Sequence, residues 1–122
     1  QYKMVFSTVT KTGQEMARKT IKADAFFYFP VDLPWVVRRV LRLIRPELVV
    51  FMETELWPNF IKTANQSGCK LVLANGRISD RSARRYKLIP ATMKKILGRM
   101  DALIMQSPQD VNYIMDLGLL FW

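Results

Sequence analysis

Short apolar runs alternate with longer segments of helical period along this chain of 122 residues, and this alternation restricts the fold more than any other feature. The run at residues 48–52 is apolar at every position, which favours a strand covered on both faces and paired in parallel. The sequence therefore predicts an α/β fold, a Rossmann-like open parallel sheet with helices on both faces. The expected strands span residues 4–8, 25–29, 48–52, 70–74 and 102–106.

Segments of helical period fill the gaps between these strands. Asp32 is expected to cap the second helix, because its side-chain oxygen can accept a hydrogen bond from a free amide and Pro34 suits the first turn. Gly68 and Gly118 suit left-handed helix ends. Residues 74–84 are expected to form a polar loop. The expected helices span residues 13–20, 34–44, 57–67, 90–98 and 108–117.

The chain has no histidine and one cysteine, which excludes several classes of site within these residues. A Ser-His-Asp triad needs histidine, and the usual zinc sites need histidine or several cysteines. Cys69 has no disulfide partner, which favours a reducing compartment, and we interpret it as a buried, inert thiol. Because no apolar run reaches the roughly 18 residues that span a bilayer, any association with a membrane should be peripheral.

The length fits one domain, and both ends of the sequence suggest a piece of a longer protein. The chain opens directly on an expected strand without an initiator Met, and it closes on four apolar residues at 119–122. We therefore expect residues 1–118 to be part of an N-terminal domain, incomplete as it stands. Residues 119–122 are expected to begin an interdomain segment or to mark a cut end.

Positive charge is concentrated in two clusters, within a formal net charge of +9. Residues 77–99 carry eight basic side chains and one acid, Asp80, and such a density favours an anionic partner. For the cluster on the second helix, a solvated helix face is the simpler interpretation. Together they form an expected patch for a membrane surface or another anion: Arg38, Arg39, Arg42, Arg45, Arg81, Arg84, Arg85, Lys87, Lys94 and Lys95.

A basic nucleic-acid-binding α/β module is the alternative function, and a non-catalytic adaptor on a membrane surface is a third possibility. The nucleic-acid module would need exposed aromatic side chains among the basic ones, because bases are bound by stacking. Tyr86 is the one aromatic residue in the densest basic stretch, and Trp35 and Trp57 lie at helix starts, where core packing is expected. The sequence therefore gives nucleic acid less support than a membrane or lipid partner.

Two acids, Glu53 and Glu55, directly follow the strand at residues 48–52. Ligands of open α/β sheets bind at the carboxyl ends of strands, so these acids can belong to a site or can cap the next helix. Spacing alone does not separate the two interpretations. Polar loops at residues 8–13 and 74–84 follow two other strands, and all three are expected to converge on one edge.

Five segments together resemble the N-terminal domain of the 3-deoxy-D-manno-octulosonate (Kdo) transferases. They are METELWPN at residues 52–59, ANGRISDRSARRY at 74–86, TKTG at 10–13, FPVDLP at 29–34 and QS-x-x-D at 106–110. The resemblance implies the N-terminal half of a GT-B glycosyltransferase that moves Kdo from CMP-Kdo to a lipid A precursor in lipopolysaccharide biosynthesis. It also implies an inverting, metal-independent reaction without a cofactor, CMP-Kdo being the donor substrate.

The resemblance also implies roles for single residues. Glu55 matches the family position that supports the transition state, and Glu53 is its secondary companion. Lys11, Gly76 and Arg85 depart from the usual Pro, Ala and Gly of the family loops. The implied acceptor-binding residues are Thr10, Thr12, Gly13, Trp57, Asn75, Arg77, Ser79 and Ser82.

The implied partners are the lipid A precursor, an anionic membrane surface and a C-terminal domain that binds the donor, and no nucleic acid is expected. The implied location is the cytoplasmic face of the bacterial inner membrane. The family's catalytic base, a Glu in an upstream segment, and the donor site are expected outside this sequence. The chain by itself is therefore expected to be inactive.

Overall fold

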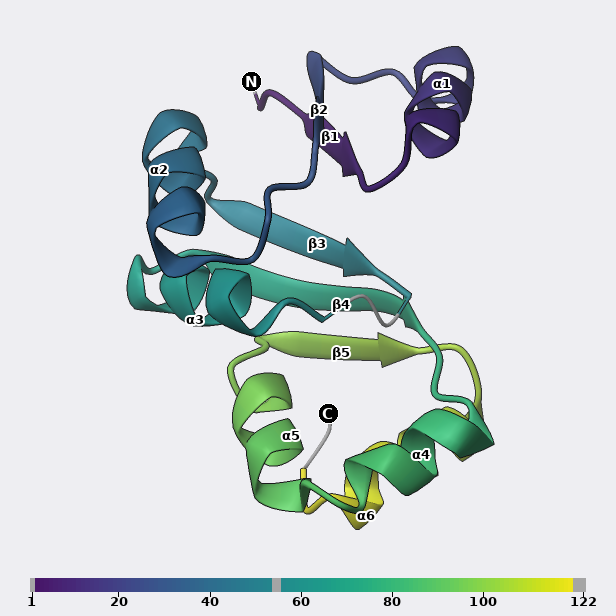
Figure 1. Cartoon of the computed structure of the whole chain (residues 1–122). Helices are drawn as coiled ribbons and strands as arrows, with labels where there is room; N and C mark the ends of the chain where they lie inside the picture. Colours follow the sequence, from purple (N-terminus) through teal and green to yellow (C-terminus); the bar gives the residue numbers. More distant parts are fainter. Residues whose placement is uncertain (1, 54–55, 120–122) are drawn as a thin grey trace. The chain divides into compact units, whose positions relative to one another are not determined.

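The computed structural model describes residues 2–53 and 56–119. The chain divides into two compact units, of which one ends at Val31 and the other begins at Asp32. The strands are parallel in both, which confirms the α/β fold (Figure 1).

The first unit is a single βαβ motif. It consists of β1 (Val5–Thr8), α1 (Lys11–Thr20) and β2 (Ala25–Tyr28), and the two strands pair in parallel from Val5 opposite Ala25 to Thr8 opposite Tyr28. Helix α1 begins where the Thr10 side chain accepts a hydrogen bond from the Gly13 amide at 3.0 Å.

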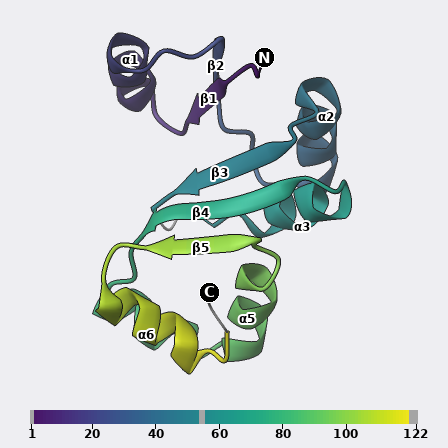
Figure 2. The same ribbon diagram turned by 180° about the vertical axis from the view of Figure 1, so that it is seen from behind.

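The second unit has three parallel strands in the order β3-β4-β5 (Figures 1 and 2). Helices α3 and α5 lie on the same side of this sheet, as right-handed crossovers require. Its elements are α2 (Pro34–Ile44), β3 (Leu48–Met52), α3 (Pro58–Gln66), β4 (Lys70–Gly76), α4 (Asp80–Tyr86), α5 (Pro90–Leu97), β5 (Ala102–Met105) and α6 (Pro108–Asp116).

The core of this unit lies between the sheet and helices α3 and α5. Leu71 and Leu73 of β4 are completely buried, and the Phe51 ring of β3 meets the Phe60 ring of α3 edge-on at 5.9 Å between centroids. On the other face of the sheet, alternate apolar side chains of the edge strands are about half exposed. They are Leu48, Val50, Met52 and Ile104. The described helices thus cover one face of β3, whereas the sequence predicted cover on both faces.

The prediction that Asp32 caps α2 is wrong. The residue before α2 is Leu33, which makes no side-chain cap, and the Asp32 carboxylate instead accepts from the amides of Asn59 and Phe60 at 3.0 and 2.8 Å. Asp32 lies one residue too early to cap α2, whereas α3 begins with Pro58 and offers these two amides close together. Asp32 therefore caps α3, a helix 27 residues further along the chain.

The polar loop expected at residues 74–84 is shorter than predicted. Strand β4 continues to Gly76, and α4 begins at Asp80, after Ser79, whose side chain accepts from the Ser82 amide at 3.1 Å. The helix has seven residues, too few for a clear helical period in the sequence. The left-handed ends at Gly68 and Gly118 are confirmed, with φ of 84° and 86°.

Candidate functional site

The carboxyl ends of β3 and β4 hold two residues in the left-handed backbone conformation. Glu53 follows β3 with φ 58°, and its amide donates to the Ala74 carbonyl of β4 at 2.9 Å. Asn75, near the end of β4, has φ 55°. Residues other than glycine seldom adopt such angles, and they cluster at functional sites. Both side chains are exposed, so this edge is open to a ligand.

Glu55 was predicted to support the transition state, and it lies outside the described residues, as does Thr54. The alternative interpretation of the acidic turn is that its carboxylates cap α3, which would require free amides in the first turn of that helix. The amides of Asn59 and Phe60 are both bonded to Asp32. Since Pro58 has no amide hydrogen, the first turn of α3 has little use for a second acidic cap. Both interpretations of the turn stay predictions.

The segment after β4 is held by the chain that follows β5. The side-chain amide of Gln106 donates to Asn75 Oδ1 at 3.0 Å, and the Gln106 backbone amide donates to the Gly76 carbonyl at 2.8 Å. A β-carbon at Gly76 would lie 2.6 Å from the Met105 sulfur, so an alanine at this position would require Met105 to move. The strand end is therefore closely packed beneath an exposed Asn75.

Asp110 anchors the loop between β4 and α4. Its buried carboxylate accepts from the Ile78 amide at 2.8 Å and from the Ser107 hydroxyl at 2.6 Å, while the Ser107 side chain caps α6. The Ser107 hydroxyl bond, the Ile78 amide and, more weakly, the charge of Arg77 lower the pKa of Asp110. Sequence reasoning missed Asp110 as a site support, although the spacing of Ser107 and Asp110 is that of a capping box.

The structure brings several predicted acceptor residues together on one segment. Asn75, Arg77, Ser79 and Ser82 lie between the end of β4 and the first turn of α4. Ser79 and Ser82 also bond to each other, with their hydroxyls 3.1 Å apart, so part of their role is to start α4. Trp57 precedes α3 and is half-buried. The acceptor roles of all these residues stay predictions.

The remaining predicted acceptor residues, Thr10, Thr12 and Gly13, belong to the first unit. Thr10 serves as the α1 cap, and a β-carbon at Gly13 would lie 2.9 Å from the Thr10 hydroxyl, which explains the glycine. The expected convergence of this loop with the two loops of the second unit stays a prediction.

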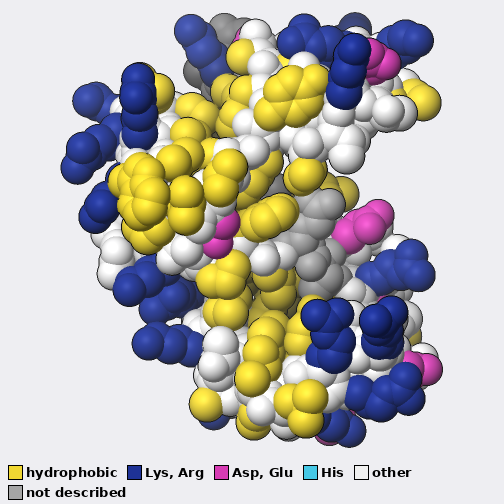
Figure 3. Space-filling view, viewed as in Figure 1, with side chains coloured by type: hydrophobic (Ala, Val, Ile, Leu, Met, Phe, Trp, Pro, Cys, Tyr) yellow, Lys and Arg dark blue, Asp and Glu magenta, His cyan; other side chains and the backbone are white. Residues whose placement is uncertain are grey.

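The two basic clusters differ in what surrounds them. On α2, Arg38, Arg39 and Arg42 line a shallow hollow together with Trp35 and Leu43, whose side chains are 64% and 76% exposed. Figure 3 shows Lys and Arg side chains around hydrophobic ones over α2, and a second basic group over α4. The expectation that Trp35 packs in the core is wrong, because Val37 and Leu41 face the core and Trp35 lies on another face of the helix.

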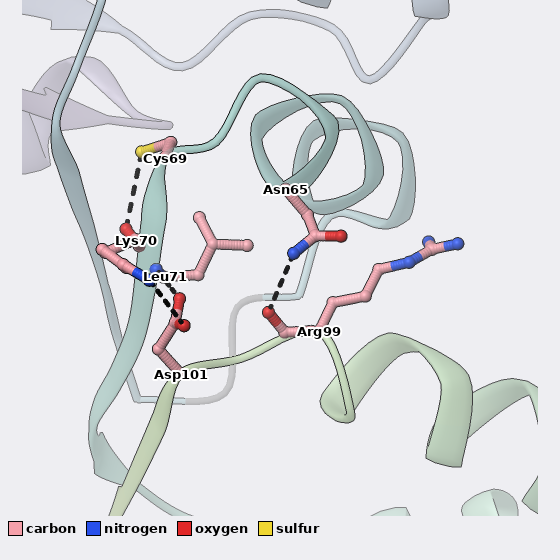
Figure 4. A network of polar contacts seen from close by, with 6 residues as sticks. All are labelled: Asn65, Cys69, Lys70, Leu71, Arg99 and Asp101. Carbon is pink, nitrogen blue, oxygen red and sulfur yellow. Dashed lines mark hydrogen bonds and ion pairs between the residues drawn. The ribbon is translucent and has the colours of Figure 1, made fainter.

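A polar network at the opposite, amino-terminal ends of β4 and β5 is structural. Asp101 accepts from the Leu71 amide at 2.8 Å and pairs with Lys70 at 3.7 Å, and Asn65 reaches the Arg99 carbonyl (Figure 4). Cys69 lies beside this network, and burial raises the pKa of its thiol. This agrees with the expected inert thiol.

In the described part of the chain, no three His, Cys, Asp or Glu side chains gather as metal ligands would. No helix among those residues is both long enough and apolar enough to cross a bilayer.

The sequence matches known proteins over nearly its whole length. The family model for 3-deoxy-D-manno-octulosonic-acid transferase (kdotransferase) matches residues 1–120. A bifunctional glycosyltransferase/methyltransferase of Fusobacterium nucleatum is 39% identical, with 94% of this chain and 18% of that protein covered. The 3-deoxy-D-manno-octulosonic acid transferase of Haemophilus influenzae is 36% identical, with 84% and 24% covered. That of Rickettsia conorii is 31% identical, with 95% and 25% covered. The chain thus spans a quarter or less of these relatives.

Proposed function

Because this chain belongs to the 3-deoxy-D-manno-octulosonic-acid transferase family, we propose that the protein carrying it transfers Kdo from CMP-Kdo to a lipid A precursor in lipopolysaccharide biosynthesis. The observation that supports this most is the family match over residues 1–120, which contains the acidic turn and the polar strand ends of the second unit. Within that protein, this chain contributes to the site for the acceptor, and a C-terminal domain binds the donor.

The reaction follows from the charges that each step creates. An acceptor sugar hydroxyl attacks the anomeric carbon of Kdo, a carboxylate base outside this chain takes its proton, and CMP leaves with the electrons of the broken bond. The attack inverts the anomeric centre, and no metal takes part. Glu55 stabilises the positive charge that develops on Kdo, as a carboxylate does in glycoside hydrolysis. Since base and donor site lie elsewhere, the chain alone transfers no Kdo.

The test uses the full-length protein that carries this chain. It is incubated with CMP-Kdo and the phosphorylated, acylated lipid A precursor, and mass spectrometry measures the lipid product. A mass gain of one or more Kdo units, absent when CMP-Kdo is left out, supports the proposal. A lipid mass that stays unchanged under conditions in which a known Kdo transferase is active contradicts it.

The α2 surface gives the enzyme a way to reach an acceptor that lies in a bilayer. Its exposed Trp35 and Leu43 can enter the lipid interface, while the neighbouring arginines meet anionic headgroups. Arginine side chains also bury their apolar stems at such an interface. We therefore propose that the protein binds the inner membrane peripherally through this surface, on the cytoplasmic face that the family resemblance implies.

Removing two charges from this surface should weaken binding to anionic vesicles. For the double variant Arg38→Ala/Arg42→Ala of the full-length protein, we expect a partition coefficient about 30-fold lower, because each cation near such a surface contributes roughly 1 kcal/mol and about 1.4 kcal/mol corresponds to a factor of ten. Trp35→Ala should instead weaken binding to neutral and anionic vesicles alike. Flotation with both kinds of vesicle measures the effects.

The matched control removes two exposed lysines outside both clusters, Lys22→Ala/Lys62→Ala, and should change binding little. Equal losses in the two double variants would mean that only net charge matters and would remove the role of α2. Parallel titrations with RNA and DNA at several salt concentrations test the alternative function. Salt-sensitive nucleic-acid binding without a preference for lipid would favour it.

A further inference from the structure

The turn between β5 and α6 and the first turn of α6 hold the end of β4 and the residues just after it through three hydrogen bonds. Two of the three bonds go to backbone atoms of this segment. The Gln106 amide donates to the Gly76 carbonyl at 2.8 Å, and the Asp110 carboxylate accepts from the Ile78 amide at 2.8 Å. The regular pairing of β4 with β5 shifts register between Leu73 and Gly76, so these bonds hold the strand end where the ladder becomes irregular. The path of the backbone is therefore fixed without any contact to the Asn75 side chain.

The third bond has a different target. The Gln106 side chain donates from Nε2 to Asn75 Oδ1 at 3.0 Å, and both side chains are exposed. A side-chain amide has one acceptor oxygen and one NH₂ donor, so a bond that occupies Oδ1 turns the Nδ2 hydrogens of Asn75 away from Gln106. A single bond between exposed side chains contributes little to folding, but it sets which end of the amide a ligand meets.

We propose that Gln106 is a positioning residue: it orients the Asn75 amide so that Nδ2 donates to an oxygen of the sugar or phosphate of the acceptor. The inference rests on the proposed function, because Asn75 is one of the acceptor residues. It adds a residue on the β5–α6 turn whose effect on the acceptor passes entirely through Asn75. Without Gln106, the amide rotates freely and spends less time in the donating orientation.

A double-mutant cycle on the full-length enzyme tests this inference. At saturating CMP-Kdo, Gln106→Ala should raise KM for the lipid A precursor about three- to tenfold, the effect of one modest hydrogen bond, with kcat changed less than about twofold. Asn75→Ala should raise this KM at least as much. In the Asn75→Ala background, Gln106→Ala should then add no further increase.

Gln109→Ala is the matched control, since it removes an exposed glutamine amide of α6 that donates to the Tyr113 hydroxyl at 3.1 Å. Its KM should equal that of the unmodified enzyme. Thermal unfolding of every variant reports on the fold, and Gln106→Met, which keeps the side-chain length, replaces the alanine variant if that one unfolds.

The outcomes separate the inference from the function on which it rests. If Gln106→Ala raises KM equally with and without Asn75, or leaves KM unchanged while Asn75→Ala raises it, Gln106 does not act through Asn75 and the inference is wrong. If Asn75→Ala leaves KM unchanged, Asn75 is not an acceptor residue and the inference falls with that assignment. If the unmodified full-length protein transfers no Kdo, the proposed function itself is wrong.

Discussion

Glu55→Gln in the full-length enzyme should lower kcat about 100- to 1000-fold, the usual loss when one group that stabilises transition-state charge is removed. Glutamine keeps the size of the side chain but not its negative charge, so KM for the acceptor should change little. The described neighbour Glu53 lies exposed just after β3, at the carboxyl end where ligands of open α/β sheets bind. Steady-state kinetics with CMP-Kdo and the lipid A precursor measure both constants.

Two further variants show whether the loss is specific. Glu47→Gln changes an exposed acid just before β3, at the opposite end of the same strand, and should leave kcat unchanged. Glu53→Gln should cost less than Glu55→Gln, because Glu53 is assigned the secondary role. Unmodified rates in Glu55→Gln, or a loss as large in Glu47→Gln, would contradict the assignment of Glu55.

Asp110→Ala should release the loop between β4 and α4, with an expected loss of about 3 kcal/mol in the free energy that keeps this segment closed. The substitution removes the carboxylate that accepts from Ile78 and Ser107 and leaves the buried Ile78 amide unpaired. Hydrogen exchange of the Ile78 amide in the full-length protein measures the opening free energy. The control is Asp116→Ala, which removes an exposed aspartate of α6, the helix that also carries Asp110. It should leave this exchange unchanged.

The same variant should show a defined pH dependence. The pKa of Asp110 is lowered in the folded protein, so its stabilising contribution is complete above the ordinary aspartate pKa of about 4 and is lost as pH falls through the lower, folded value. The difference between unmodified protein and Asp110→Ala should therefore be constant near neutral pH and shrink below about pH 4. A difference that grows on acidification would contradict this role of the carboxylate.

The elements that repeat a local pattern could be predicted from the sequence. Strand β3 lies at its expected bounds, Leu48–Met52, because five apolar residues in succession between polar turns leave few alternatives. Helix α4 was missed because its seven residues carry mostly charged side chains, and Ala83 is its one buried residue. A short helix that begins with a serine cap has too weak a pattern to be separated from a loop.

Bonds between distant parts of the chain could not be predicted. Asp32 lies two residues before Pro34 in the sequence, yet its carboxylate binds amides of α3, and no local rule indicates a partner 27 residues away. The support of the site by Gln106 and Asp110 depends on the register of β4 and β5, which the sequence does not specify. The location of the polar strand ends was predictable because parallel strands bring their carboxyl ends to one edge.

At Glu53 and Asn75, the left-handed backbone conformation brings the stability of the fold into conflict with the function of these strand ends. Glycine adopts φ values of 58° and 55° without steric cost, whereas a side chain with a β-carbon does so at an energetic penalty. A screen for heat-resistant variants should therefore recover glycine at these two positions, and catalysis should suffer in the same clones. Engineers who want a more robust enzyme should leave these two residues unchanged and improve the scaffold elsewhere.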